Sequence, residues 1–60
     1  MPNVDHVLAD GTSVTAAALG LSSALEEYAL NQNSTTYFAL HTEAILVREH
    51  AVALVTALES

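Results

Sequence analysis

Few side chains in this chain of 60 residues could do chemistry: three histidines, one arginine and seven acidic residues. A metal site on a helix needs a second ligand three or four residues after the first, so that both face the same side. His41 has alanine and isoleucine at those positions, and Glu26, Glu43 and Glu49 have only apolar residues there. The sequence therefore predicts no metal site and no bound cofactor.

Nucleophilic and acid–base catalysis find no better support. Residues 20–24, Gly-Leu-Ser-Ser-Ala, resemble a nucleophile elbow, but that motif needs a strand-to-helix turn and here falls within a helical periodicity. In a helix, His41 and His50 point to opposite sides, and Arg48 and His50 point about 200° apart. We predict that the protein is not an enzyme. The alternative is an enzyme whose site assembles at an oligomer interface from His41, Arg48 and His50.

The charge of the chain is strongly negative, −6 at pH 7. Nucleic acids and anionic lipids are bound through Lys and Arg, so this charge disfavours both. An acidic surface suits a basic protein partner instead. No stretch reaches the ~18 apolar residues of a membrane span, and the first residues lack the basic start of a signal peptide. We expect a cytoplasmic protein that binds neither nucleic acid nor membranes.

The elements that must position these residues are helices. An apolar stripe with the 4-3-4-3 spacing of a helical bundle predicts a helix at about 13–31, through Val14, Ala18, Leu21, Leu25 and Tyr28. Upstream, Asp10-Gly11 is a turn signal and Thr12 or Ser13 is a suitable N-cap. Residues 1–12 are therefore expected to be an N-terminal extension, and residues 13–60 a helical hairpin.

A second helix is predicted at about 35–58, and it is apolar on two sides. Its main stripe has 4-3-4-3-4 spacing: Leu40, Ala44, Val47, Ala51, Leu54 and Leu58. A second stripe, Phe38, Ile45 and Val52, lies 120–160° away by the 100° turn per residue. Residues 31–34 form the break, where Asn can adopt the left-handed conformation that ends helices and Ser34 can cap the next helix. So short a connection makes the helices antiparallel, with contacting residue numbers adding up to about 66.

A chain of this size buries only about 60% of its unfolded surface, and without cysteine it has no disulfide to compensate. We therefore predict an all-α fold, an antiparallel helical hairpin that dimerises into a four-helix bundle. The first helix should cover the main stripe of the second. The expected dimer interface is Phe38, Ile45, Val52, Leu19 and Leu30.

Arg48 falls opposite about Ala18 within such a hairpin, two turns from Glu26 and Glu27. We therefore expect Arg48 to pair with Glu26 or Glu27 across the subunit interface. The predicted function is a small acidic protein–protein interaction module that acts as a homodimer and regulates or inhibits another protein.

Overall fold

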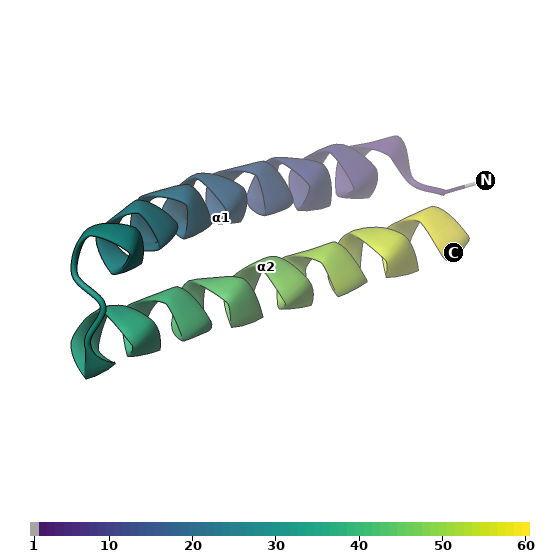
Figure 1. Cartoon of the computed structure of the whole chain (residues 1–60). Helices are drawn as coiled ribbons and strands as arrows, with labels where there is room; N and C mark the ends of the chain where they lie inside the picture. The colour runs from purple at the N-terminus through teal and green to yellow at the C-terminus, as the bar shows by residue number, and fades with distance from the viewer. Residues whose placement is uncertain (1) are drawn as a thin grey trace.

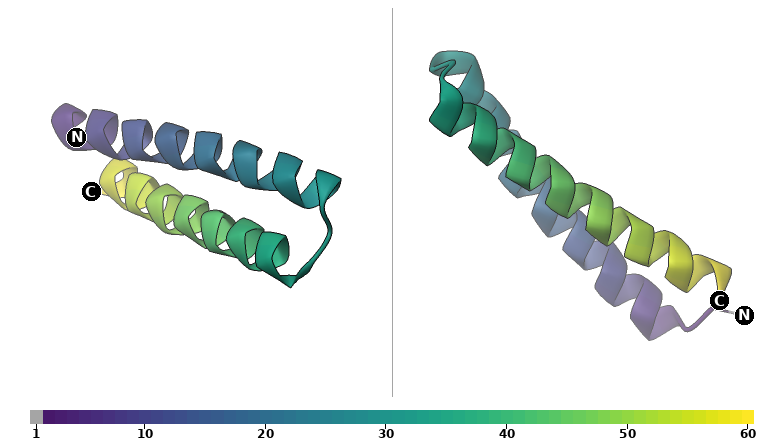
Figure 2. Two further views of the ribbon diagram at one scale, coloured as in Figure 1. Left: turned by 90° about the vertical axis from the view of Figure 1, so that its left-hand side faces the viewer. Right: turned by 90° about the horizontal axis from the view of Figure 1, so that it is seen from below.

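The computed structural model describes residues 2–60, and these form two helices joined by a short turn. Helix α1 spans Val4–Leu30 and helix α2 spans Ser34–Glu59. The helices lie side by side and antiparallel, with both ends of the chain at the same end of the molecule (Figures 1 and 2). The Cα atoms extend over 45 × 13 × 10 Å. The predicted all-α helical hairpin is confirmed.

Helix α1 begins much earlier than predicted, at Val4 instead of about residue 13. Its N-cap is Asn3, whose side-chain oxygen accepts hydrogen bonds from the backbone N–H groups of Asp5 (2.9 Å) and His6 (3.2 Å). Asn is among the best N-caps because it satisfies backbone donors that have no partner within the helix. The N-terminal extension predicted for residues 1–12 is therefore mostly the first turns of α1.

The turn predicted at Asp10-Gly11 is wrong, because α1 runs through it without a break. The hydroxyls of Thr12 and Ser13, predicted as alternative N-caps, cap nothing; they donate to the carbonyl oxygens of Leu8 (2.8 Å) and Ala9 (3.1 Å). This back-bonding lets a polar residue sit inside a helix with its hydroxyl satisfied. A helical Gly costs about 1 kcal/mol relative to Ala, which packing along a long helix overrides.

The turn between the helices uses different caps from those predicted. Asn31 ends α1 in an extended conformation with φ −137°, and no residue from 2 to 60 has a positive φ, so the left-handed Asn is wrong. The cap of α2 is Asn33, not Ser34. Asn33 and Thr36 form a reciprocal capping box, with N–H···O distances of 3.0 and 3.2 Å. The Thr36 hydroxyl also donates to the carbonyl oxygen of Asn31 and so ties the two helix ends together.

Two contacts define the register of the helices. The carboxylate of Glu43 lies against Gly20, and the rings of Tyr28 and Tyr37 have centroids 6.4 Å apart. These residue numbers add up to 63 and 65, close to the predicted sum of about 66. A residue of α1 is therefore level with the residue of α2 whose number is about 64 minus its own.

The seam between the helices is rotated from the predicted one. Residues that are buried or half-buried at 3-4 spacing are Val7, Asp10, Val14, Ala17, Leu21, Ala24 and Tyr28 on α1, and Thr36, Leu40, Glu43, Val47, His50, Leu54 and Ala57 on α2. Two leucines predicted for the seam stand outside it: Leu25 is 54% exposed and Leu58 52%. The small residues Ala17 and Ala24 occupy the seam instead and leave larger apolar side chains in solvent.

The hairpin has almost no core of its own. Among residues 2–60, Ala24 is the only buried hydrophobic residue, at 9% exposure. The accessible surface is 4420 Å², whereas a globular monomer of this mass exposes about 3,700 Å². The radius of gyration is 13.8 Å, against about 10 Å for a compact domain of this length. A single hairpin therefore exposes several hundred Å² more than a self-sufficient domain.

Candidate interaction surface

The large apolar side chains that the hairpin exposes are Val4, Leu8, Leu19, Leu25 and Leu30 on α1, and Tyr37, Phe38, Leu46, Val52, Val55 and Leu58 on α2. By the 100° turn per residue, six of them lie on one flank of the seam: Val4, Leu8, Leu25, Tyr37, Val55 and Leu58. Leu19, Phe38 and Val52 point away from the seam, and Leu30 and Leu46 lie on the other flank. Antiparallel helices turn in opposite senses when seen from one end, so this flank is the same side of the molecule for both helices. We call this side the open apolar face.

The open apolar face consists of two rows on each helix, since residues seven apart fall on one line. The inner rows, next to the seam, are Val4, Gly11, Ala18 and Leu25 on α1, and Tyr37, Ala44, Ala51 and Leu58 on α2. The outer rows, farther from the seam, are Leu8, Thr15, Ser22 and Ala29 on α1, and Ser34, His41, Arg48 and Val55 on α2. The inner rows are apolar except for the hydroxyl of Tyr37, whereas the outer rows contain a cation, an imidazole and three hydroxyls.

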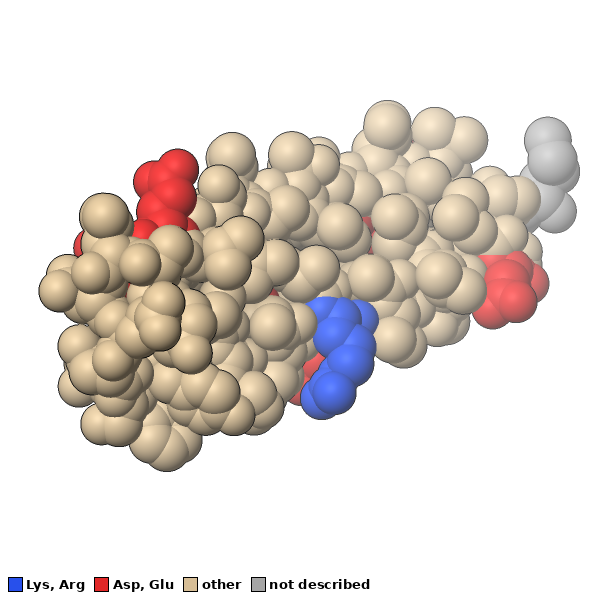
Figure 3. Space-filling model, viewed as in Figure 1, with Lys and Arg blue, Asp and Glu red and all other residues tan. Residues whose placement is uncertain are grey.

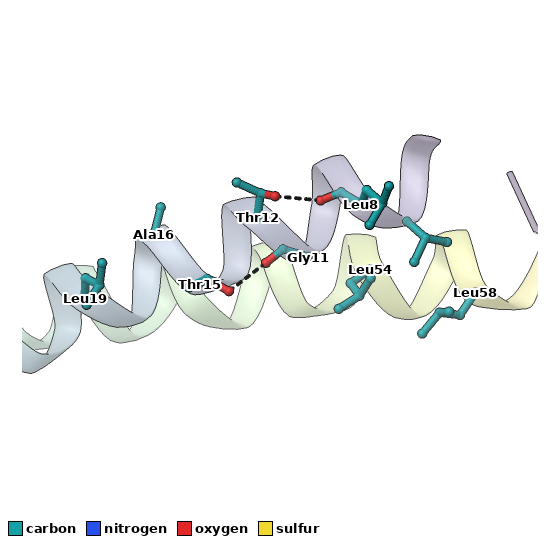
Figure 4. Close-up of a pocket in the computed structure, with 9 residues that line it drawn as sticks. Leu8, Gly11, Thr12, Thr15, Ala16, Leu19, Leu54 and Leu58 are labelled. Atoms are coloured by element: carbon teal, nitrogen blue, oxygen red, sulfur yellow. Dashed lines mark hydrogen bonds between the residues drawn. The ribbon is translucent and has the colours of Figure 1, made fainter. Parts of the chain in front are cut away.

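A groove of about 750 Å³ opens on this side near the chain termini, between α1 and the end of α2 (Figure 4). Its lining includes Leu8, Thr15, Leu19, Leu54 and Leu58. The threonine hydroxyls in it are turned onto backbone carbonyls, so the groove presents mainly hydrocarbon. Such a groove suits apolar side chains of another helix.

Arg48 lies in a second groove, which is formed by α2 alone and is also lined by Ala51, Val52, Val55 and Glu59. The blue cation in Figure 3 stands on a surface that is otherwise largely neutral. Its long stem can cover apolar surface while the guanidinium stays in water. Arg48 thus belongs to the open apolar face, and it is the only Lys or Arg of the chain.

The predicted interface residues are mostly exposed in the single chain: Phe38 64%, Val52 60%, Leu19 69% and Leu30 82%, while Ile45 is half-buried. By the helical turn, Leu19, Phe38, Ile45 and Val52 point away from the seam, next to the outer rows, whereas Leu30 lies on the other flank of α1. Sequence reasoning missed the centre of the open apolar face, because it assigned Leu25 and Leu58 to the seam and Leu8 to an extension. The signal that could have placed Leu8 in the helix is Val7, which lies seven residues before Val14 and extends the apolar stripe upstream.

The predicted ion-pair residues are not brought together within the chain. Glu26 lies seven residues after Leu19, on the line of α1 that points away from the seam, and so lies outside the outer row. Glu27 instead lines a separate groove of about 340 Å³ on the side opposite the open apolar face, together with Gly20, Thr36 and Glu43. Pairing of Arg48 across a subunit interface stays a prediction.

The residues of the alternative catalytic site have different surroundings. His41 is exposed and stacks on Tyr37, with ring centroids 6.2 Å apart and planes tilted by 15°. His50 is half-buried in the seam, and Arg48 lies in its own groove. Within one chain, these three side chains do not converge on a common point.

Tyr37 is the centre of an aromatic cluster near the turn. Besides His41, it contacts Tyr28 on the other helix and Phe38, whose ring lies 5.9 Å away edge to face. Such pairs contribute about 0.5–1.5 kcal/mol beyond their buried area. The cluster stabilises the packing of the two helices at the end of the hairpin that contains the turn.

Among residues 2–60, no three side chains of the His, Asp or Glu type gather as metal ligands. Neither helix combines the length and apolar character needed to cross a bilayer. Comparisons with protein-family models, curated proteins and solved structures found no match.

Proposed function

We propose that the protein is a homodimeric interaction module: two hairpins join through the open apolar face into a four-helix bundle, and the acidic outside of the bundle binds a basic surface of another protein. The observation that carries the first part is the lack of a core, with Ala24 alone buried among the described hydrophobic residues. A second copy supplies apolar surface of matching chemistry, because the partner face is the same face.

The exposed area supports a dimer quantitatively. The hairpin exposes 4420 Å², roughly 700 Å² more than a globular monomer of its mass. A stable interface covers about 800 Å² on each partner. A second hairpin that covers the open apolar face would therefore bury an area about equal to the surplus surface that the single chain exposes.

Sedimentation equilibrium at micromolar concentration tests the dimer, with a mass of twice 6.3 kDa expected. The thermal midpoint, followed by far-UV circular dichroism, should rise with protein concentration because association and folding are coupled. A well-folded species of 6.3 kDa with a concentration-independent midpoint would contradict the proposal.

The partner-binding role is supported by the charge, −6 for each copy. Glu27 and Glu43 line one groove on the side opposite the open apolar face, so dimerisation through the open apolar face leaves them accessible. A basic protein would be steered toward such a surface. A regulator or inhibitor needs no more than this, since it acts by covering the surface it binds.

The test is affinity capture from the source cell with the native protein and with a variant that carries Glu27→Gln and Glu43→Gln. Basic proteins retained by the native dimer and released from the variant support the role. Equal capture by both proteins would speak against it. Sedimentation of the variant checks that the dimer itself is unchanged.

A further inference from the structure

The outer rows of the open apolar face contain a pattern that the single hairpin does not use. By the register of the helices, Leu8 is level with Val55, Thr15 with Arg48, and Ser22 with His41; each pair of numbers adds up to 63, as for Gly20 and Glu43. In these three pairs an apolar residue is level with an apolar one, and a hydroxyl is level with a cation or an imidazole. The fourth pair of the rows, Ala29 and Ser34 beside the turn, does not follow this match.

These matched residues do not meet within one chain. Leu8 and Thr15 line the groove at the open end, whereas Arg48 and Val55 line the groove on α2. The outer rows lie on the same side of the hairpin, but each is turned away from the seam and so from the other row. Contact within the chain therefore does not explain why their chemistry matches level by level.

We infer that the two copies of the proposed dimer pack with their hairpins parallel, both turns at one end, so that α2 of each copy lies on α1 of the other. This inference rests on the proposed homodimer. A two-fold axis along the helices keeps every residue at its own level, so the outer row of α1 meets the outer row of α2 from the second copy. The inner rows then meet in the centre of the bundle.

Each matched pair becomes a contact in this arrangement. Val55 of the second copy enters the apolar groove beside Leu8. Arg48 of the second copy reaches the hydroxyl of Thr15, which donates its own proton to the carbonyl oxygen of Gly11 and keeps lone pairs to accept the guanidinium. Ser22 and His41 can exchange a hydrogen bond in the same way.

The antiparallel arrangement does not give these contacts. In that arrangement the two-fold axis crosses the helices near their middle, so the outer row of α2 faces the same row of the second copy. Arg48 then lies close to Arg48 of the second copy, and Val55 lies near His41. Both cations would lose hydration beside a like charge, with no acid in either outer row to compensate.

A shifted antiparallel dimer is the remaining alternative. The stripe of α2 that contains Arg48, Val52, Val55 and Glu59 could pack against the same stripe of the second copy, running in the opposite direction. Arg48 would then meet Glu59 of the second copy. That overlap covers only residues 48–59, about 18 Å of helix, out of a molecule 45 Å long. It leaves Leu25 and Tyr37 uncovered, so it buries far less than a stable dimer needs.

The parallel arrangement also bears on the ion pair predicted from the sequence. Arg48 of one copy is level with about Ala16 of the other, roughly ten residues or 15 Å from Glu26. Arg48 therefore meets Thr15 instead of either glutamate. Glu26 lies nearer to His41 of the second copy, which is level with about residue 23.

Spin labels at the turn measure the orientation directly. The chain has no cysteine, so Gln32→Cys gives one label site per copy, at an exposed position of the turn. Parallel hairpins place the two labels within about 30 Å, because neighbouring helix axes are about 10 Å apart. Either antiparallel dimer separates them by the 45 Å length of the hairpin or more, a result that would overturn the inference and leave the dimer standing. A monomer in sedimentation would overturn both.

A negative charge placed opposite Arg48 tests the orientation independently, because the parallel and the antiparallel dimer predict opposite changes in the dissociation constant. In the parallel dimer, Thr15→Glu of each copy faces Arg48 of the other copy, which gives two ion pairs per dimer. The dissociation constant should therefore fall about 2- to 10-fold. In an antiparallel dimer the same change adds like charges on facing α1 helices and weakens association. Thr42→Glu is the matched control, because it adds the same charge at an exposed threonine on the side of the hairpin opposite the open apolar face. Tightening by Thr15→Glu alone supports the parallel dimer, whereas equal weakening by both variants contradicts it.

Discussion

The carboxylate of Glu43 occupies the space that a side chain at Gly20 would need: a Cβ atom built on Gly20 would lie 2.6 Å from Oε2 of Glu43. Gly20 lies in the middle of α1, where Gly costs about 1 kcal/mol relative to Ala. The close approach that a helical glycine suggests is therefore made by a flexible side chain, and not by the backbone of a neighbour.

Replacing Gly20 by Ala should consequently stabilise the protein, because Glu43 can swing aside toward solvent while α1 gains helix propensity. We expect a gain in the free energy of unfolding of up to about 1 kcal/mol by urea denaturation. In a Glu43→Ala background the same substitution should give the full gain, and the difference between the two measures the cost of moving Glu43. A loss of stability in the native background would show that Glu43 is held firmly in place.

The cap of α2 offers a second test, in which sequence and structure disagree. Asn33→Ala removes the acceptor for the backbone N–H of Thr36 and should destabilise the protein by about 1 kcal/mol. Ser34→Ala is the control: Ser34 is the first residue of α2, and its substitution should change the free energy of unfolding by a few tenths of a kcal/mol at most. A larger loss of stability from Ser34→Ala than from Asn33→Ala would show that Ser34 is the N-cap of α2.

The hairpin itself could be predicted from the sequence because its evidence is redundant. Two long stripes with 4-3 spacing and a polar break at residues 31–34 admit no other simple arrangement. The start of α1 was missed because Asp10, Gly11, Thr12 and Ser13 each favour a turn when considered alone. Only the structure shows the hydroxyls donating back to the helix and Asn3 capping it.

The rotation of the seam was not predictable from periodicity. Ala17 and Ala18 are neighbours, as are Ala24 and Leu25, so two stripes about 100° apart fit the pattern of α1 equally well. Close approach of the helices selects the smaller residues. The candidate site moves with that choice, because Leu25 leaves the seam and becomes part of the open apolar face.

Charge introduced into the open apolar face should dissociate the dimer. Leu25, 54% exposed in the single hairpin, lies in an inner row, so Leu25→Glu would bury a carboxylate in the centre of the bundle. We expect the loss of the dimer in sedimentation, together with a loss of helical signal at low concentration. Leu46→Glu is the matched control on the opposite side, where Leu46 is 38% exposed. Equal dissociation by both variants would mean that the interface lies elsewhere.

Nucleic acid should not bind. The chain has one cation for seven acids, whereas each phosphate contact needs a cation that releases counterions. We expect no mobility shift of double-stranded DNA or of RNA at physiological salt. A shift that weakens steeply as salt is added would contradict this prediction and point to a cationic surface formed by association around Arg48.

Added salt should strengthen the dimer, in contrast to its effect on a protein that binds a polyanion. Each copy has a charge of −6, so association brings two like-charged particles together, and their repulsion opposes it. Raising the ionic strength from about 0.01 M to 1 M shortens the Debye length from about 30 to 3 Å and screens this repulsion. The dissociation constant from sedimentation should fall, most strongly at low salt. The variant with Glu27→Gln and Glu43→Gln has two fewer negative charges per copy and should respond less. A dissociation constant that rises with salt would mean that attraction between opposite charges, and not apolar burial, holds the copies together.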